Sequence, residues 1–280
     1  MSLHIVACIK QVPDSSQIRV HPVTNTIMRQ GVPAVVNPFD LVSLEEALRL
    51  KDRFGAHVTV LSMGPKMAAE ALKKCISYGA DDAILITDRV FAGSDTLATS
   101  YALSSAIRTI AASRPVDMVF CGKQTIDGDT AQVGPGIARR LGLQQLTYVS
   151  RIESVDPVAR EIVVHRRAEG GVQVLQSRLP CLVTMMEGAN TIRFAGMDDM
   201  FRAARCEVQE WDHKAAGITE LARCGLKGSP TVVKKVFAPQ PRANKAEIID
   251  TAGRSARESV QALLERLGSR HPGLEAEALP

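Results

Sequence analysis

Short apolar runs alternate with longer amphipathic stretches over the first half of the chain. The apolar runs, which are typical of buried strands, lie at residues 5–9, 58–62, 83–86 and 118–121. Apolar positions recur with helical spacing at residues 41–54, 67–78, 97–113 and 132–141. This alternation predicts βαβ units, and therefore an α/β fold with a doubly wound, mostly parallel sheet and helices on both faces.

The pattern changes between residues 147 and 184. Four short segments there alternate or run apolar: YVSRIESVD, EIVVHRRAE, VQVLQSRLP and CLVTMM. They are interrupted by Asp156-Pro157 and by Gly170-Gly171, which are residue pairs that favour turns. We therefore expect these segments to be antiparallel strands that extend the sheet. The first domain is predicted to cover residues 1–186.

Regular alternation is lost after residue 186. One further helix is expected at about residues 255–267, after a loop-rich stretch. A segment with so little core of its own is expected to dock on another protein, so residues 187–280 are predicted to be a partner-recognition loop and a C-terminal docking arm. The alternative is a tail folded back onto its own domain.

The stretch GKQTIDGDTAQVGPGIARRLG, residues 122–142, follows a strand-like run and leads into a helix. Gly122, Gly128 and Gly134 allow the backbone to approach a ligand closely or to take a positive φ, and Thr130 can cap the helix. Pro135 is compatible with the first turn of that helix. Free N–H groups near residues 130–134 are then expected to point outward, where the helix dipole favours a phosphate. The alternative is an ordinary βα turn capped by Asp129 or Thr130.

Composition excludes several classes of protein. The chain has 280 residues, 45% of them apolar and 23% charged, with a net charge of +4 and 4% aromatic residues. So few aromatic residues and so mild a charge argue against a nucleic-acid-binding protein. No apolar run approaches the roughly 18 residues of a membrane span, and the N-terminus leads directly into LHIVACIKQV. We expect a cytoplasmic protein without a transmembrane segment.

The cysteines and histidines give no pattern of a metal or catalytic site. The 6 cysteines are scattered without a CxxC pair or a Cys/His cluster, and the 6 histidines are equally dispersed. No arrangement of a nucleophile with a general base stands out in the sequence. We therefore predict no metal site and no catalytic residue, and we expect Cys8, Cys121 and Cys181 to be buried in strands.

Several segments in order resemble the beta subunit of electron transfer flavoproteins over nearly the whole length. They are KQVPD at 10–14, NPFD followed by EEALRLKD within 37–52, SMGP at 62–65, the loop at 122–135 and LPCLVT at 179–184. The resemblance implies a heterodimer with an alpha subunit, which holds most of the electron-transferring FAD. It implies electron transfer between a dehydrogenase or other oxidoreductase and an acceptor, with this chain as a carrier subunit rather than a self-contained catalyst.

Matching positions imply that the nucleotide contacts lie at strand ends and in the loop before the helix. They are Cys8, Asn37, Pro38, Phe39, Asp40, Met63, Gly122, Gln124, Thr125, Asp127, Gly128, Asp129, Thr130, Ala131, Gln132, Val133, Gly134 and Pro135. Asn37 can hold a loop or bind a ribose or phosphate. For Phe39 the favoured alternative is core packing beneath the loop.

The loop also bears on which nucleotide is bound. One branch of the family binds AMP in the beta subunit, with a loop like IDDDCNQTGQ, and another binds a second FAD there and bifurcates electron pairs from NADH. Here the loop reads IDGDTAQVGP, and both it and KGSPT at 227–231 resemble the FAD-binding branch. Smaller residues leave room for a pyrophosphate, so FAD is favoured over AMP, with NADH as a possible donor to the complex.

Residues 190–205 match the position of the family's partner-recognition loop. The usual Asn-Glu-Pro-Arg-Tyr start is replaced by NTIRF, and Met197 stands where a leucine is common. The resemblance implies that Arg193, Met197 and Met200 dock a client dehydrogenase, with Met as an adaptable anchor. The alternative makes Met197 and Met200 core residues of a helix.

Two other functional classes compete with this interpretation. A stand-alone nucleotide-binding regulatory protein has the same α/β layout, but it leaves the segment after residue 186 without a purpose. An adenylating enzyme requires a Ser/Gly-rich loop after the first strand, where this chain has KQVPD. The second class is therefore disfavoured.

Overall fold

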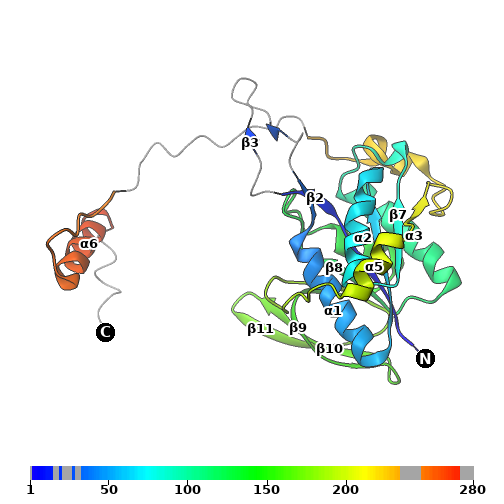
Figure 1. Ribbon diagram of the computed structural model, residues 1–280, viewed down its shortest axis with the longest axis horizontal. Helices are drawn as coiled ribbons and strands as arrows, with labels where there is room; N and C mark the ends of the chain where they lie inside the picture. Colours follow the sequence, from blue (N-terminus) through cyan, green and yellow to red (C-terminus); the bar gives the residue numbers. More distant parts are fainter. Residues whose placement is uncertain (1, 15–18, 21–26, 29–32, 234–246, 272–280) are drawn as a thin grey trace. The chain divides into compact units, whose positions relative to one another are not determined.

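The computed structural model describes residues 2–14, 19–20, 27–28, 33–233 and 247–271 (Figure 1). The chain divides into two compact units, residues 1–237 and residues 238–280. The predicted division into a nucleotide-binding α/β domain, residues 1–186, and a partner-docking segment, residues 187–280, stays a prediction.

One sheet forms the centre of the first unit. Its strands follow the order β11-β10-β9-β12-β8-β1-β6-β7-β13. The parallel part consists of β1 (His4–Cys8), β6 (His57–Met63), β7 (Asp82–Ile86), β8 (Met118–Gly122), β12 (Cys181–Met185) and β13 (Gln209–Trp211). The predicted α/β fold with a mostly parallel sheet is confirmed.

An antiparallel extension continues this sheet, as predicted. It consists of β9 (Gln144–Asp156), β10 (Glu161–Ala168) and β11 (Gly171–Arg178). The prediction that CLVTMM belongs to it was wrong, because β12 lies between β8 and β9 and runs parallel to both. Every residue of β12 is buried, which is typical of a central parallel strand covered on both faces.

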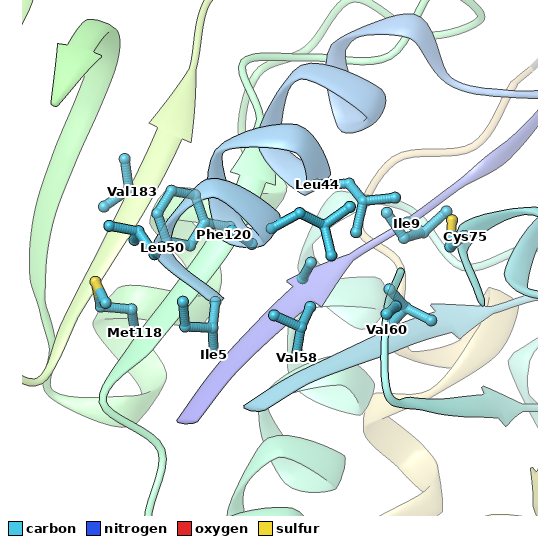
Figure 2. Packing of buried hydrophobic residues seen from close by; sticks show 14 of the residues in the cluster. Ile5, Ile9, Leu44, Leu50, Val58, Val60, Cys75, Met118, Phe120 and Val183 are labelled. Atoms are coloured by element: carbon cyan, nitrogen blue, oxygen red, sulfur yellow. The ribbon is translucent and has the colours of Figure 1, made fainter. Parts of the chain in front are cut away.

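Helices cover both faces of the sheet. Along β1, Ile5 and Ala7 face one apolar cluster while Val6 and Cys8 face another. The first cluster includes residues of α1 (Pro38–Phe54) and α2 (Ala69–Tyr78), and the second includes residues of α3 (Thr96–Ser113) and α4 (Val133–Leu141). Figure 2 shows Leu44 and Leu50 of α1 with side chains of the strands beside them. Each fully buried aliphatic side chain stabilises the fold by roughly 1.5–3 kcal/mol.

Shorter elements complete the described residues. They are β2 (Gln11–Pro13) paired with β5 (Ala34–Val36), β3 (Arg19–Val20) paired with β4 (Ile27–Met28), α5 (Met197–Arg205), the 3₁₀ turns η2 (Lys66–Ala68), η3 (Arg89–Phe91), η4 (Leu221–Arg223) and η5 (Gly225–Gly228), and α6 (Ala256–Arg270) in the second unit. Within the described ranges, no helix is both long and apolar enough to span a membrane.

Candidate functional site

The carboxyl ends of three neighbouring strands meet at one edge of the sheet. β8, β1 and β6 are adjacent and parallel, so Gly122, Cys8 and Met63 all lie at this edge. Cys8 is buried and Met63 is half-buried. Open parallel sheets bind their ligands outside the carboxyl ends of the strands, so the predicted residues lie where such a site is expected.

Asn37 holds the β8–α4 loop against the start of α1. It is fully buried, and its side-chain amide donates to the carbonyl of Gln124 at 2.9 Å. Its side-chain oxygen accepts from the N–H of Ile126 at 3.2 Å. Both polar atoms of the side chain are therefore used within the protein. Of the two roles expected for Asn37, the geometry shows that it holds a loop.

Asp40 joins the ends of β1 and β8. Its carboxylate accepts from the N–H of Lys10 at 2.8 Å and from the N–H of Gly122 at 3.1 Å. Burial raises the pKa of Asp40 to about 7, although these donors and the side chain of Asn37 favour the charged form. Asp40 therefore holds the ends of β1 and β8 together beside the loop.

Two of the three glycines in the loop are required by close packing. A Cβ on Gly122 would lie 2.5 Å from Oδ1 of Asp40 and 2.7 Å from Cβ of Phe39, and one on Gly134 would lie 2.8 Å from Cγ2 of Thr184. A Cβ on Gly128 would meet only Oγ1 of Thr125, at 3.5 Å. These contacts are with the protein itself, and none of the three glycines has a positive φ, so the expected close approach of the backbone to a ligand stays a prediction.

The turn before α4 uses positive φ angles at residues other than glycine. Asp129 has φ = 51° and Ala131 has φ = 54°, a left-handed conformation that is uncommon outside glycine. The N–H groups of Gly128 and Asp129 both donate to the carbonyl of Thr125, at 3.3 and 2.9 Å. This turn leads the chain around the strand end and into the helix.

The N-terminus of α4 has no side-chain cap. Its N-cap residue is Gln132, which makes no capping hydrogen bond, so the expectation that Asp129 or Thr130 caps the helix was wrong. The side chain of Asp129 instead accepts from Gln124, at 2.8 Å. Within the described structure, the backbone N–H groups of residues 130–134 have no partner. Pro135 lies in the first turn, as predicted.

Lys10 was not among the predicted binding residues, although it lies in a strand-end segment. Its ammonium contacts both carboxylate oxygens of Asp127 at 2.8 Å, which ties the loop after β1 to the loop after β8. Burial raises the pKa of Asp127, but hydrogen bonds from Lys10 and Thr125 outweigh it and hold the pKa below its usual value. This contact could not be found from the sequence, because Lys10 and Asp127 come together only where the ends of β1 and β8 are neighbours in the sheet.

The remaining predicted residues surround the loop. Phe39 is half-buried beneath Gly122, and the ammonium of Lys123 lies 4.9 Å from the centre of its ring. This placement favours the packing role for Phe39. Pro38 is exposed at the first position of α1, and Val133 is half-buried at the start of α4.

The predicted docking residues behave differently from one another. Arg193 is bound to α1: its Nε donates to Glu45 at 2.9 Å, and an Nη donates to Asp52 at 2.7 Å. Met197 and Met200 are 64% and 42% exposed, so they are not core residues of this unit. Sequence reasoning missed Phe194, whose side chain is 97% exposed beside Arg193.

A pocket among the described residues lies apart from the strand-end site. It lies where α5 approaches α2, and it is lined by Ile76, Asp81, Asp198, Phe201, Arg202, Arg205 and Cys206. The strand-end site is instead an open edge with exposed residues at 127–130. Its chemistry rests on backbone N–H groups rather than on an enclosed cavity.

Comparison with known proteins identifies relatives over the whole chain. Residues 24–216 match the model of the electron transfer flavoprotein domain. The chain is 65% identical over 275 residues to protein FixA of Azotobacter vinelandii, with 98% of each chain covered. It is 61% identical over 274 residues to protein FixA of Rhizobium meliloti, covering 98% of this chain and 94% of that protein.

The chain is also similar to proteins that are named as beta subunits of electron transfer flavoproteins. The chain is 42% identical over 269 residues to the electron transfer flavoprotein subunit beta of Clostridium acetobutylicum, covering 96% of this chain and 99% of that protein. The matches extend across both compact units.

Proposed function

This chain belongs to the electron transfer flavoprotein family, and from that premise we propose that it is a beta-type subunit that works as a heterodimer with an alpha-type subunit. The pair passes electrons between a dehydrogenase or NADH and an acceptor. This chain binds an adenine nucleotide at the strand-end site and is a carrier subunit rather than a self-contained catalyst.

The uncapped N-terminus of α4 carries this proposal. Backbone N–H groups at residues 130–134 have no partner among the described residues, and the positive end of the helix dipole lies at the same place. Backbone donors of this kind bind phosphate groups at helix N-termini. Asn37 and Asp40 hold the loop and strand ends around them.

The residues of the loop fit FAD, and we favour FAD over AMP. Gly128 and Thr130 are exposed and small, and a Cβ at Gly128 would meet only Thr125. This side of the loop therefore has room for a pyrophosphate and the group beyond it. When bound, FAD would supply the electron-accepting ring, while residues 130–134 would hold its phosphates. Electron bifurcation from NADH is the finer proposal, since it requires a second flavin in this chain.

Nucleotide content tests the proposal directly. The chain is co-expressed with its alpha-type subunit, the purified complex is denatured, and released FAD and AMP are quantified against protein. Two FAD per heterodimer support FAD in this chain and justify measuring reduction by NADH. One FAD with one AMP makes the complex a simple electron shuttle, and absence of any nucleotide from this chain overturns the site.

The segment from residue 187 onward completes the proposal. Asn190 and Arg193 hold the start of this segment on α1, through Glu46 at 3.0 Å and Glu45 at 2.9 Å. Phe194, Met197 and Met200 remain exposed beyond these contacts. We assign these side chains to docking of a client dehydrogenase, with Arg193 positioning the segment rather than contacting the client. We propose that the contacts to partners lie within residues 187–280.

A further inference from the structure

The KGSPT segment at 227–231 folds against the loop that precedes α3. Three residues form this contact, and we name them the Asp95 clamp: Asp95, Ser229 and Thr231. The N–H of Asp95 donates to Oγ of Ser229 at 2.8 Å. Oδ2 of Asp95 accepts from both the N–H and the hydroxyl of Thr231, at 3.1 and 2.8 Å. Segments more than 130 residues apart are therefore joined side by side.

Asp95 performs a second task with its other oxygen. Oδ1 accepts from the N–H groups of Leu97 and Ala98, at 2.9 and 3.0 Å, and so caps α3. Ser229 is buried, and its hydroxyl donates to the carbonyl of Gly225 at 2.7 Å. The clamp thus uses each oxygen of Asp95 for a different segment. Hydrogen bonds to a carboxylate are stronger than neutral ones.

The glycines of this segment are required by its close packing. Gly225 has φ = 57°, and a Cβ there would collide with the carbonyl oxygen of Val90. A Cβ on Gly228 would collide with the backbone of Arg223. Glycine is therefore required at both positions for the segment GLKGSPT to pack here.

The Asp95 clamp is connected to the strand-end site through the first turns of α3 and α4. Thr96, the residue after Asp95, donates from its hydroxyl to the side-chain oxygen of Gln132 at 2.8 Å. Gln132 is the N-cap residue of α4 and lies within the row of unpartnered N–H groups at 130–134. Near the same end of the two helices, a Cβ on Gly136 would lie 2.8 Å from Cβ of Ser100. Little room is left for α3 to move without α4.

We propose that the Asp95 clamp positions the N-termini of α3 and α4, so that adenine-nucleotide binding at α4 and attachment of residues 225–231 stabilise each other. The inference rests on the proposed function, because it takes the ligand at α4 to be an adenine nucleotide. Thr231 is a positioning residue, which acts through Asp95, Thr96 and Gln132.

Substitutions at Thr231 separate this role from the capping of α3. Thr231→Val removes the hydroxyl donor and leaves both the N–H of residue 231 and the cap bonds of Asp95. Thr231→Ser keeps the hydroxyl and is the conservative control. Thr219→Val is the matched control, because Thr219 is exposed and its hydroxyl makes no hydrogen bond to the other described residues. The full-length chain is used throughout.

Two readouts are compared for each variant: the Kd for FAD and for AMP, and amide hydrogen exchange over residues 93–98, 122–135 and 225–233. In the unsubstituted chain, nucleotide is expected to slow exchange at 122–135 and also at 225–233. Loss of one charge-assisted hydrogen bond predicts a rise in Kd of about threefold to tenfold for Thr231→Val. Thr231→Ser and Thr219→Val keep the original Kd and the protection at 225–233.

The outcomes distinguish the inference from the proposed function. Protection at 122–135 without any change at 225–233, or an unchanged Kd in Thr231→Val, overturns the clamp and leaves the nucleotide site standing. A rise in Kd in which Thr231→Ser behaves like Thr231→Val also overturns it, because the hydroxyl is then irrelevant. Failure of both nucleotides to bind the unsubstituted chain, alone and in complex with its alpha-type subunit, overturns the proposed function and the coupling together.

Discussion

At the scale of single residues, the site depends on close packing of side chains and backbone at the ends of β1 and β8. Gly122 ends β8 directly against Asp40 and Phe39, and Asp40 accepts from the backbone on both sides of the edge. Buried polar groups of this kind are costly to leave unpaired. The position of the loop is therefore sensitive to a single methyl group at Gly122.

Gly122→Ala tests this close packing. The added Cβ must displace Asp40 or the backbone of Phe39, so the free energy of unfolding is expected to fall by about 1–3 kcal/mol. Urea unfolding followed by circular dichroism measures the change. Gly128→Ala is the matched control, because its Cβ meets only Oγ1 of Thr125 at 3.5 Å. Equal stability of the two variants would contradict the packing argument.

The Asp40 carboxyl predicts a pH dependence of stability. Its pKa is raised by burial to about 7 in the folded chain, from the ordinary value of 3.8. Between these two values the folded chain holds a proton that the unfolded chain has lost. The stability that Asp40 contributes is therefore largest below pH 4, and it falls by about 1.4 kcal/mol per pH unit until the pH passes 7.

Unfolding in urea at pH 5 and at pH 8 measures this contribution. The difference in unfolding free energy between the unsubstituted chain and Asp40→Asn is expected to change with pH, in the direction that favours the unsubstituted chain at pH 5. Asp156→Asn serves as the control, because Asp156 is exposed at the last position of β9. A constant difference across this range would show that Asp40 is charged throughout.

At the scale of elements, apolar patterning predicted the type of most strands and helices but not how they pair. The runs at 5–9, 58–62, 83–86 and 118–121 correspond to β1, β6, β7 and β8. β12 was misassigned because a short buried run looks the same in a parallel or an antiparallel strand. The cap of α4 was misassigned because the side chain of Asp129 binds Gln124 instead of the helix N-terminus. The hydrogen bonds of Asn37 and Lys10 could not be predicted from the sequence, because they join loops that are distant along the chain.

Arg193 links two elements and gives an element-scale prediction. Glu45 of α1 is buried, and it receives the guanidinium of Arg193 at 2.9 Å and that of Arg49 at 3.0 Å. Arg193→Met leaves a buried carboxylate short of partners, so unfolding free energy is expected to fall by about 1–3 kcal/mol. Hydrogen exchange at residues 190–196 is expected to accelerate in the same variant.

A surface ion pair provides the control for that substitution. Lys73 lies 3.7 Å from Glu70 on the outside of α2. Exposed pairs of this kind contribute about 0–1 kcal/mol, so Lys73→Met is expected to leave stability nearly unchanged. An equal loss of unfolding free energy in both variants would show that the contact of Arg193 with Glu45 stabilises the fold no more than an exposed ion pair.

Met197 tests the docking role of α5. Its side chain is exposed at the first position of the helix, next in sequence to Asp198 and Asp199. Met197→Glu is expected to lower the rate of electron transfer from the client dehydrogenase by about tenfold, the effect of losing an interface anchor worth roughly 1.4 kcal/mol. Flavin content is expected to stay constant. Val158→Glu, at the exposed β9–β10 turn, is the control, and equal rates in both variants would remove Met197 from the interface.

At the scale of the whole molecule, the two units differ in how much core they have. The first unit buries two apolar clusters against one sheet. In the second, α6 has a well-formed capping box at Ser255 and Glu258, yet none of its residues is buried. Its larger apolar residues recur at helical spacing and stay exposed: Val260, Leu263, Leu264 and Leu267. An isolated helix of this length is only marginally stable in water, so its stability is expected to come from packing of this apolar stripe against another surface.

Leu264→Lys tests whether this apolar stripe binds the alpha-type subunit of the proposed heterodimer. Burial of a leucine contributes roughly 1.5–3 kcal/mol, so the substitution is expected to weaken the complex by about tenfold or more. Ser269→Lys adds the same charge away from the stripe and is expected to leave affinity unchanged. The amides of residues 256–270 exchange rapidly in the free chain and slowly in the complex, if the stripe is covered there. Rapid exchange in both states, with equal affinity of the two variants, would assign partner binding to the first unit alone.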